Sequence, residues 1–166
     1  MIKKNKTGFT LVELIIVIVI LGILAVTALP KFIDFRSNAI VASSQNLAGT
    51  VRSASALVYS KSVIAGVAKQ PSAEVSINGQ TVDVVYGYPA GTKEGISAAI
   101  NFDEGDWAND LKDKEWHSRA SIYSGAWVYW HGNISENAGN IQCYIRYRQS
   151  TGVNMEPVID IELSEC

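Results

Sequence analysis

Cysteine is scarce in this 166-residue chain, and both copies, Cys143 and Cys166, lie near its C-terminal end. A zinc site would need more ligands at closer spacing, so one disulfide is the better interpretation of the pair in an exported chain. Closing a loop of roughly 24 residues would stabilise the fold by about 3.4 kcal/mol in the chain-entropy treatment. The pair therefore predicts a disulfide formed in an oxidising compartment.

Residues that carry catalysis are also few. The two histidines, His117 and His131, lack the neighbouring cysteine or carboxylate pattern of a zinc site or a catalytic triad. The chain has neither a G-x-S-x-G motif nor a glycine-rich phosphate loop. The sequence predicts a protein that is not an enzyme and that needs no cofactor or metal.

Basic residues are few and unevenly placed. Three of the 14 lysines and arginines, Lys3, Lys4 and Lys6, lie in the first eight residues, which contain no acid. Beyond them the 16 acidic residues predominate, so the rest of the chain is mildly acidic. Because no basic stripe could follow a phosphate backbone, nucleic acid is not expected as the main partner.

Two clusters in the second half allow alternative interpretations. The segment 103–110 gathers Asp103, Glu104, Asp106 and Asp110, which could hold Ca²⁺ but do not follow the EF-hand pattern, so a solvated loop is favoured. The second cluster consists of four tryptophans, which could stack on sugars or, as is more usual, fill a small core. These are Trp107, Trp116, Trp127 and Trp130.

The stretch from Phe9 to Leu29 is apolar apart from one ionisable residue, Glu13. It is long enough to span a bilayer, and the lysines before it predict a cytoplasmic N-terminus with the bulk of the chain outside. A secretory signal peptide, cleaved near Val26 to Ala28, and a plain single-pass anchor are the alternatives. A charge at bilayer depth costs about 2.5 to 3.5 kcal/mol, so Glu13 needs an explanation.

The string GFTLVEL, from Gly8 to Leu14, resembles the processing site of type IV prepilins. In that family a short basic leader ends in glycine, the next residue is usually phenylalanine or methionine, and glutamate is fifth in the mature chain. The resemblance implies that a prepilin peptidase cuts between Gly8 and Phe9 and that the new N-terminus at Phe9 is methylated. The product is expected to be a filament subunit.

Cleavage would create an ammonium group at Phe9, on the same helix as Glu13 and about 6 Å away along its axis. In an isolated helix the Glu13 carboxylate is expected to be uncompensated. A neighbouring subunit displaced by one turn could bring its own ammonium against Glu13, and a low dielectric would strengthen the pair. We expect this pair to set the stagger between subunits more than to add stability. The alternative is that Glu13 simply reaches the membrane interface.

Gly22 and Pro30 interrupt this apolar helix, so a bend or a soft segment is expected between them. In type IVa pilins, residues at the matching positions bound a stretch that loses helicity when subunits pack, which the resemblance carries over to Gly22 and Pro30. Ordinary tolerance of glycine and proline in membrane helices is the alternative.

Beyond Pro30, apolar residues three or four apart predict an amphipathic continuation of the helix to about Ala68. The following region, from about Pro71, alternates apolar and polar residues between turns. A hairpin is predicted around Asn78-Gly79, then a short helix, then strands beginning near Ala126, Ile141 and Pro157. The expected fold class is α+β, in which a long N-terminal helix packs by its second half on a small antiparallel sheet.

Four segments follow from these observations: a leader at 1–8, a hydrophobic half-helix at 9–36, an amphipathic half-helix at 37–69 and a globular head at 70–166. The helix, the αβ-loop after it and the C-terminal disulfide again resemble type IV pilins. The segment VIVILGILAVTALPKF most resembles the pilins of mannose-sensitive haemagglutinin (MSHA) pili.

The resemblance implies a major pilin that is stored in the inner membrane and then polymerised into an extracellular pilus for adhesion. Its expected partners are copies of itself, the prepilin peptidase and methyltransferase, the assembly machinery, and a surface or cell receptor, with a glycan as one candidate. Two rivals remain. A type II secretion pseudopilin is disfavoured because major pseudopilins usually lack the C-terminal disulfide, and a monomeric glycan-binding module would use the tryptophans.

Overall fold

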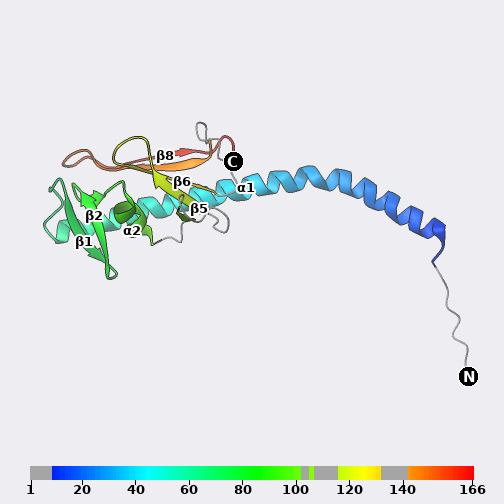
Figure 1. The fold of residues 1–166 in the computed structure, drawn as a ribbon, viewed down its shortest axis with the longest axis horizontal. Coiled ribbons are helices and arrows are strands. Elements are labelled where there is room, and N and C mark those ends of the chain that lie inside the picture. Colours follow the sequence, from blue (N-terminus) through cyan, green and yellow to red (C-terminus); the bar gives the residue numbers. More distant parts are fainter. Residues whose placement is uncertain (1–8, 102–104, 107–115, 132–141) are drawn as a thin grey trace, which may run out of the picture. The chain divides into compact units, whose positions relative to one another are not determined.

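The computed structural model describes residues 9–101, 105–106, 116–131 and 142–166, with the backbone alone described for 28–34. The chain divides into two compact units, Met1–Ala39 and Ile40–Cys166. Helix α1, Leu11–Ile64, extends through the described part of the first unit and into the second. All strands of the described residues belong to the second unit (Figure 1).

Helix α1 ends at Ile64, several residues short of the predicted end, because Gly66 takes a left-handed φ of 73°. The Gly66 N–H donates to the Val63 carbonyl at 3.1 Å, and the Val67 N–H donates to the Ser62 carbonyl at 2.9 Å. These two bonds form a Schellman motif, which satisfies carbonyls at the helix end. Glycine at position 66 was the signal in the sequence that marks this end.

Besides the second half of α1, the described residues of the second unit form two sheets, with one short helical stretch between them in the sequence. The first sheet has three strands in the order β1-β2-β3, and the second has five in the order β4-β5-β6-β7-β8. The elements are β1 Ala73–Ile77, β2 Gln80–Val85, β3 Tyr88–Pro89, the π-helical turn η1 Lys93–Ser97, α2 Ala98–Ile100, β4 Gly105–Asp106, β5 Trp116–Ala120, β6 Ala126–His131, β7 Tyr144–Arg148 and β8 Val158–Glu162.

The predicted hairpin is confirmed by the pairing of β1 with β2. Ile77 faces Gln80, and the two residues between them, Asn78 and Gly79, have φ values of 52° and 85°. Positive φ at both central positions is the requirement of a type I′ turn, which Asn-Gly satisfies at low cost. The predicted strands β6, β7 and β8 and the short helix are also confirmed, and so is the α+β fold class.

The head differs in two details from the small antiparallel sheet that was expected. The strands of the second unit form two sheets, and β4 pairs with β5 in parallel. Strand β5 was missed because its first three residues, Trp116, His117 and Ser118, are all buried. Burial on both faces removes the alternation of apolar and polar residues by which a half-exposed strand is recognised.

The second half of α1 supplies side chains to the cores of both sheets. Leu47, Ala48 and Val51 pack in one cluster with residues of the five-stranded sheet, including Tyr129 and Ile145. About two turns further along the helix, Val58 packs with the inner face of the first hairpin. Packing of the amphipathic half-helix on the head is thereby confirmed, and it explains why the head forms one unit with this part of the helix.

Serines occupy part of this buried helix face, which an apolar pattern does not detect. Ser44, Ser55 and Ser62 are all at least nine-tenths buried, whereas Ala39 and Ala42, which fit the expected apolar spacing, are exposed. The Ser62 hydroxyl donates to the Val58 carbonyl at 3.0 Å. A small residue whose hydroxyl bonds back to its own helix can be buried at little cost, so serine substitutes here for alanine.

The tryptophans behave mostly as core residues. Trp116 and Trp130 are 4% and 2% exposed, and Trp127 packs against the larger cluster. Trp107 lies outside the described residues. Since a buried ring presents no face to a sugar, the glycan-stacking alternative is wrong for Trp116 and Trp130.

Candidate assembly segment

Thr10 and Glu13 form a reciprocal hydrogen-bonded cap at the start of α1. The N–H and the hydroxyl of Thr10 both donate to Oε2 of Glu13 at 2.9 Å, and the Thr10 hydroxyl oxygen accepts from the Glu13 N–H at 3.3 Å. This arrangement is a capping box, which satisfies N–H groups that have no partner within the helix. The T-x-x-E spacing before an apolar run is its signal in the sequence.

The cap corrects the expectation that the Glu13 carboxylate is uncompensated in a single helix. Thr10 supplies two donors, and the N-terminal end of the helix dipole also favours an anion. Both residues are exposed, so the carboxylate remains accessible to a group from outside the chain. Phe9, which precedes the cap, is 85% exposed.

Large apolar side chains of the first unit are exposed throughout their described length. From Phe9 to Val26 each of them is between 47% and 85% exposed. A continuous apolar surface of this length is unusual on a protein that stays alone in water, and it indicates an interface or a lipid contact. Within the part of the chain that the structure describes, no helical stretch reaches the length and hydropathy needed to cross a membrane.

The other predicted site residues of this segment stay predictions. Gly8 lies outside the described residues, so the structure does not bear on cleavage before Phe9. Helix α1 continues through both Gly22 and Pro30, and a β-carbon added at Gly22 would meet nothing within 4 Å. Packing within the single chain therefore does not require glycine at this position. The loss of helicity expected between Gly22 and Pro30 applies to subunits packed in a filament and stays a prediction.

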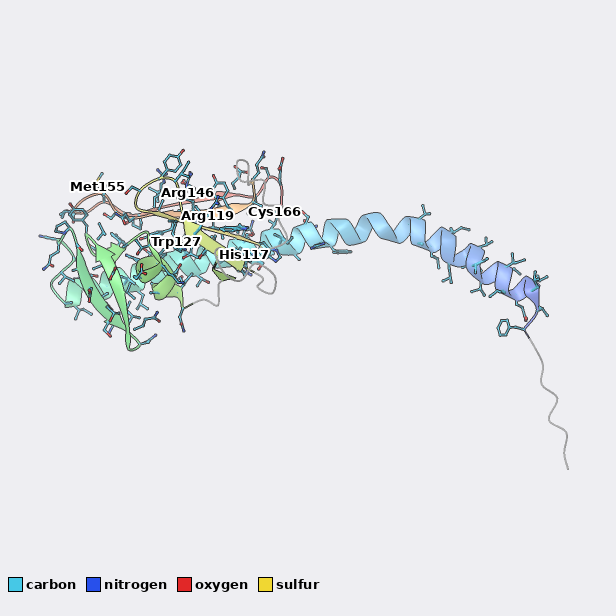
Figure 2. The ribbon with its side chains drawn as sticks, in the orientation of Figure 1. His117, Arg119, Trp127, Arg146, Met155 and Cys166 are labelled. Atoms are coloured by element: carbon cyan, nitrogen blue, oxygen red, sulfur yellow. A yellow bond between two sulfur atoms is a disulfide. The ribbon has the colours of Figure 1, made fainter. Side chains whose placement is uncertain are left out.

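The disulfide between Cys143 and Cys166 is confirmed. Cys143 is 1% exposed and lies directly before β7, and the Glu165 N–H donates to the Gln142 carbonyl at 3.2 Å. The bond thus holds the last residues beside the start of β7, where Figure 2 labels Cys166. The C-terminal segment is fixed covalently to the five-stranded sheet.

The outer side of this sheet carries a small charge network, which includes Arg146 (Figure 2). Asp160 of β8 lies opposite Arg146 of β7 and accepts from it at 2.9 and 3.1 Å, and the Arg148 side chain also lies 3.1 Å from this carboxylate. Partial burial opposes ionisation, but these hydrogen bonds outweigh it and hold the pKa of Asp160 below its ordinary value of 3.8.

We expect Asp160→Asn to lower the free energy of unfolding by about 1 kcal/mol at neutral pH, or roughly 4 °C in melting temperature. A depressed pKa contributes stability that is present above the ordinary value of 3.8 and is lost as the pH falls below it. The difference between the two proteins should therefore shrink toward zero in acid. Thermal melting of the full chain in detergent across pH measures this, with the exposed Glu74→Gln as control. A difference that stays constant into acid would contradict the assignment.

The acidic segment receives no metal assignment. Asp103, Glu104 and Asp110 lie outside the described residues, and Asp106 belongs to β4. Among the residues that the structure does describe, no three histidine, cysteine or acidic side chains are grouped so as to hold a metal ion. The preference for a solvated loop over a calcium site in segment 103–110 therefore stays a prediction.

Comparison with known proteins gives consistent relatives. Residues 3–29 match the family model of the prokaryotic N-terminal methylation motif. The chain is 38% identical to the fimbrial protein EcpC of Eikenella corrodens over 60% of its own length and 66% of that protein. It is 36% identical to the type IV major pilin protein PilE1 of Neisseria gonorrhoeae over 66% of each chain.

A third relative is the type IV narrow pilus major component PilA5 of Thermus thermophilus, 52% identical over 30% of this chain and 43% of that protein. The chain thus spans just under two thirds of EcpC and of PilE1, and less than half of PilA5. No solved structure matches.

The matched motif places the chain among the prokaryotic proteins that carry this N-terminal signal. Within that class its relatives are pilins and fimbrial proteins, and its long helix leads into an α+β head with a C-terminal disulfide. The chain belongs to the type IV pilin family.

Proposed function

We propose that this chain is the major structural subunit of a type IV pilus, which is held in the inner membrane and then polymerised into an extracellular filament for attachment to surfaces or cells. The observation that carries the proposal is the continuous exposed apolar surface from Phe9 to Val26. Two of the relatives are themselves named as major pilus or pilin components, which agrees with an abundant rather than an accessory subunit.

An apolar helix surface of this kind has two stable environments, lipid and a bundle of its own copies. The first is provided by the inner membrane, with the N-terminus cytoplasmic and the head outside. The second is provided by the filament, whose core is formed by the segment from Phe9 to about Ala54. The same surface therefore serves for storage and for assembly.

Cleavage and methylation of the N-terminus prepare the chain for assembly into the filament. In this proposal a prepilin peptidase cuts between Gly8 and Phe9, and a methyl group is added to the new amine. That amine carries the positive charge that pairs with Glu13 of an adjacent copy, and the pair selects one stagger among many that an apolar surface alone would allow. Gly22 and Pro30 bound the stretch that loses its helical structure as the helices of neighbouring subunits pack.

The head faces outward in this arrangement and meets the surface or receptor. We also propose that the pilus is of the MSHA subtype, that the pilus assembly machinery of the inner membrane builds it, and that a glycan is one candidate receptor. The confirmed disulfide favours a pilin over a type II secretion pseudopilin, since major pseudopilins usually lack this bond.

Shearing cells that express the chain tests the proposal. We expect long fibres in the sheared fraction, made of a subunit that begins at Phe9 and is one methyl group heavier than its sequence. Gly8→Val should keep the leader and yield no fibres, because the peptidase site is lost. Electron microscopy and intact-mass measurement give the readouts. An absence of fibres, or fibres that retain the leader, would overturn the proposal.

A further inference from the structure

The head has an open pocket of about 460 Å³ between the second half of α1 and the loop that precedes β8. Tyr59 of α1 and Tyr88 of β3 form its apolar part, with their rings stacked at a centroid distance of 4.4 Å, and Ile159 adds an aliphatic side chain. Arg52 and Glu156, both exposed, lie at its rim. We call this site the tyrosine pocket.

The charges at the rim are of opposite sign and lie beside the apolar surface. Burial, together with the neighbouring Glu156 carboxylate, raises the pKa of Tyr88, so this ring stays neutral at any physiological pH. Ser60 adds a hydroxyl at the edge. The pocket thus combines two stacked rings and an aliphatic side chain with the hydroxyls of Ser55 and Ser60, and the two charges at its rim balance. This lining suits an uncharged, largely apolar group better than a strongly charged one.

A second feature of the head matches this description. The turn between β5 and β6 consists of residues 121–125, with the sequence SIYSG, and we call it the hairpin tip. Ile122 in it is 93% exposed, more than any other large apolar side chain among the described residues. Tyr123 beside it is 58% exposed. The tip therefore presents two apolar side chains between two serines and carries no charge.

Hydrogen bonds at both ends of the hairpin tip and a cation–π contact link it to its neighbours. The Ser121 N–H donates to the Ala126 carbonyl at 2.9 Å, and the Gln149 N–H donates to the Gly125 carbonyl at 2.9 Å. The guanidinium of Arg146 lies 5.5 Å from the centre of the Tyr123 ring. A tip ordered in advance loses little entropy on binding, so its exposed side chains are suited to act as an anchor.

We propose that the hairpin tip of one subunit inserts Ile122 into the tyrosine pocket of a neighbouring copy in the filament. The match is in chemistry: an uncharged apolar knob with serines on either side enters an apolar pocket with a charge-balanced rim. Tip and pocket are different patches of the same head, so the contact is head-to-tail and can repeat along a fibre without closing. The inference rests on the proposed filament function and extends it to the heads.

Position-specific crosslinking tests the contact in the full chain. A photoreactive benzoylphenylalanine at Ile122, in cells that produce fibres, should crosslink to peptides that contain Tyr59, Tyr88 or Glu156 of another copy. The same probe at Ser76, an exposed residue of β1 outside both patches, is the control and should not label that pocket. Sheared fibres are illuminated, and the crosslinked dimers are mapped by mass spectrometry.

Substitutions give an independent readout. Ile122→Asp would place a carboxylate among the tyrosine rings of the pocket, close to Glu156, and should lower the yield of sheared fibres roughly tenfold or more, whereas Ile122→Leu should keep it near wild type. Glu156→Lys added to Ile122→Asp should restore a substantial part of the loss. Because Ile122 contacts solvent, head folding is expected to be intact, and disulfide formation checks this.

The outcomes separate the two proposals. Wild-type cells without fibres would overturn the filament function and with it this contact. Abundant fibres whose Ile122 crosslinks fall outside the pocket, or whose yield is unchanged by Ile122→Asp, would overturn the contact alone. Crosslinks into the pocket together with rescue by the charge reversal would establish it.

Discussion

Replacing Glu13 by alanine is expected to abolish fibres while the protein still accumulates in the membrane. If the carboxylate pairs with the Phe9 amine of a neighbour in the filament core, its removal leaves a buried ammonium without a partner. Breaking a buried ion pair in this way costs about 3 to 5 kcal/mol. That energy corresponds to a loss of association of roughly 100-fold or more, and it applies at every subunit contact. The yield of fibres after shearing measures the loss of assembly, and the amount of chain in the membrane fraction measures accumulation.

The cap at the start of α1 allows the charge to be tested separately from helix stability. Glutamine can replace glutamate in a capping box, so Glu13→Gln should keep the hydrogen bonds with Thr10 and lose only the charge. We expect Glu13→Gln to be as defective as Glu13→Ala. Thr10→Val removes the hydroxyl of the cap at a cost of about 1 kcal/mol and leaves the charge in place, so it should reduce fibre yield far less.

A lower fibre yield from Thr10→Val than from Glu13→Gln would contradict the proposed pairing of Glu13 with the Phe9 amine. If Glu13→Gln gave normal fibres and Thr10→Val did not, the function of Glu13 would be to cap the helix. If all three variants gave normal fibres, neither the charge nor the cap would govern assembly, and the apolar surface alone would have to set the stagger between subunits.

Local rules account for the parts of the fold that were predicted correctly. The hairpin was predictable because Asn78 and Gly79 tolerate positive φ at adjacent positions, which few residue pairs do. Strand β7 was predictable because Ile145 and Tyr147 are buried while the residues between and beside them are not. In β8 the alternate residues Ile159 and Ile161 pack against the same core. In each case the signal lies within a few residues of the element it specifies.

The features that were missed depend on contacts distant in sequence. Burial of Ser44 and Ser55 on the inner face of α1 follows from what packs against them, which no helical periodicity of apolar residues records. The backbone of Gly91, after β3, also lies against the β5–β6 turn, where an added β-carbon would clash with the Gly125 carbonyl oxygen. Such close approach requires glycine, but nothing near Gly91 in the sequence indicates its distant neighbour.

The candidate site divides in the same way. Gly8, Phe9 and Glu13 could be predicted as site residues because the string that indicates them, GFTLVEL, is local in the sequence and does not depend on contacts with the head. The bonds between Thr10 and Glu13 were also local and could have been predicted from the spacing. The tyrosine pocket could not, because Tyr59, Tyr88 and Glu156 come from three elements that only the folded head brings together.

The second large effect is expected on removal of the disulfide by the double substitution Cys143→Ser and Cys166→Ser. The bond closes a loop with a sequence separation of 23, for which the chain-entropy treatment gives about 3.4 kcal/mol. For a unit the size of Ile40–Cys166 this corresponds to a fall in melting temperature of roughly 10 to 15 °C. Near-ultraviolet circular dichroism of the full chain in detergent, which reports on the buried tryptophans, follows the transition.

Reduction of the wild-type bond should reproduce this shift, because the stabilisation comes from the covalent link and not from the sulfur atoms themselves. Ser164→Ala is the matched control, since it removes only the exposed hydrogen bond from Ser164 to the Gln142 side chain beside the bond. It should change the melting temperature by no more than about 2 °C. If the double variant melted within that range of wild type, the hydrogen bonds between the last residues and the start of β7 would suffice to fix the C-terminus, and the disulfide would add resistance to opening outside the cell without adding to equilibrium stability.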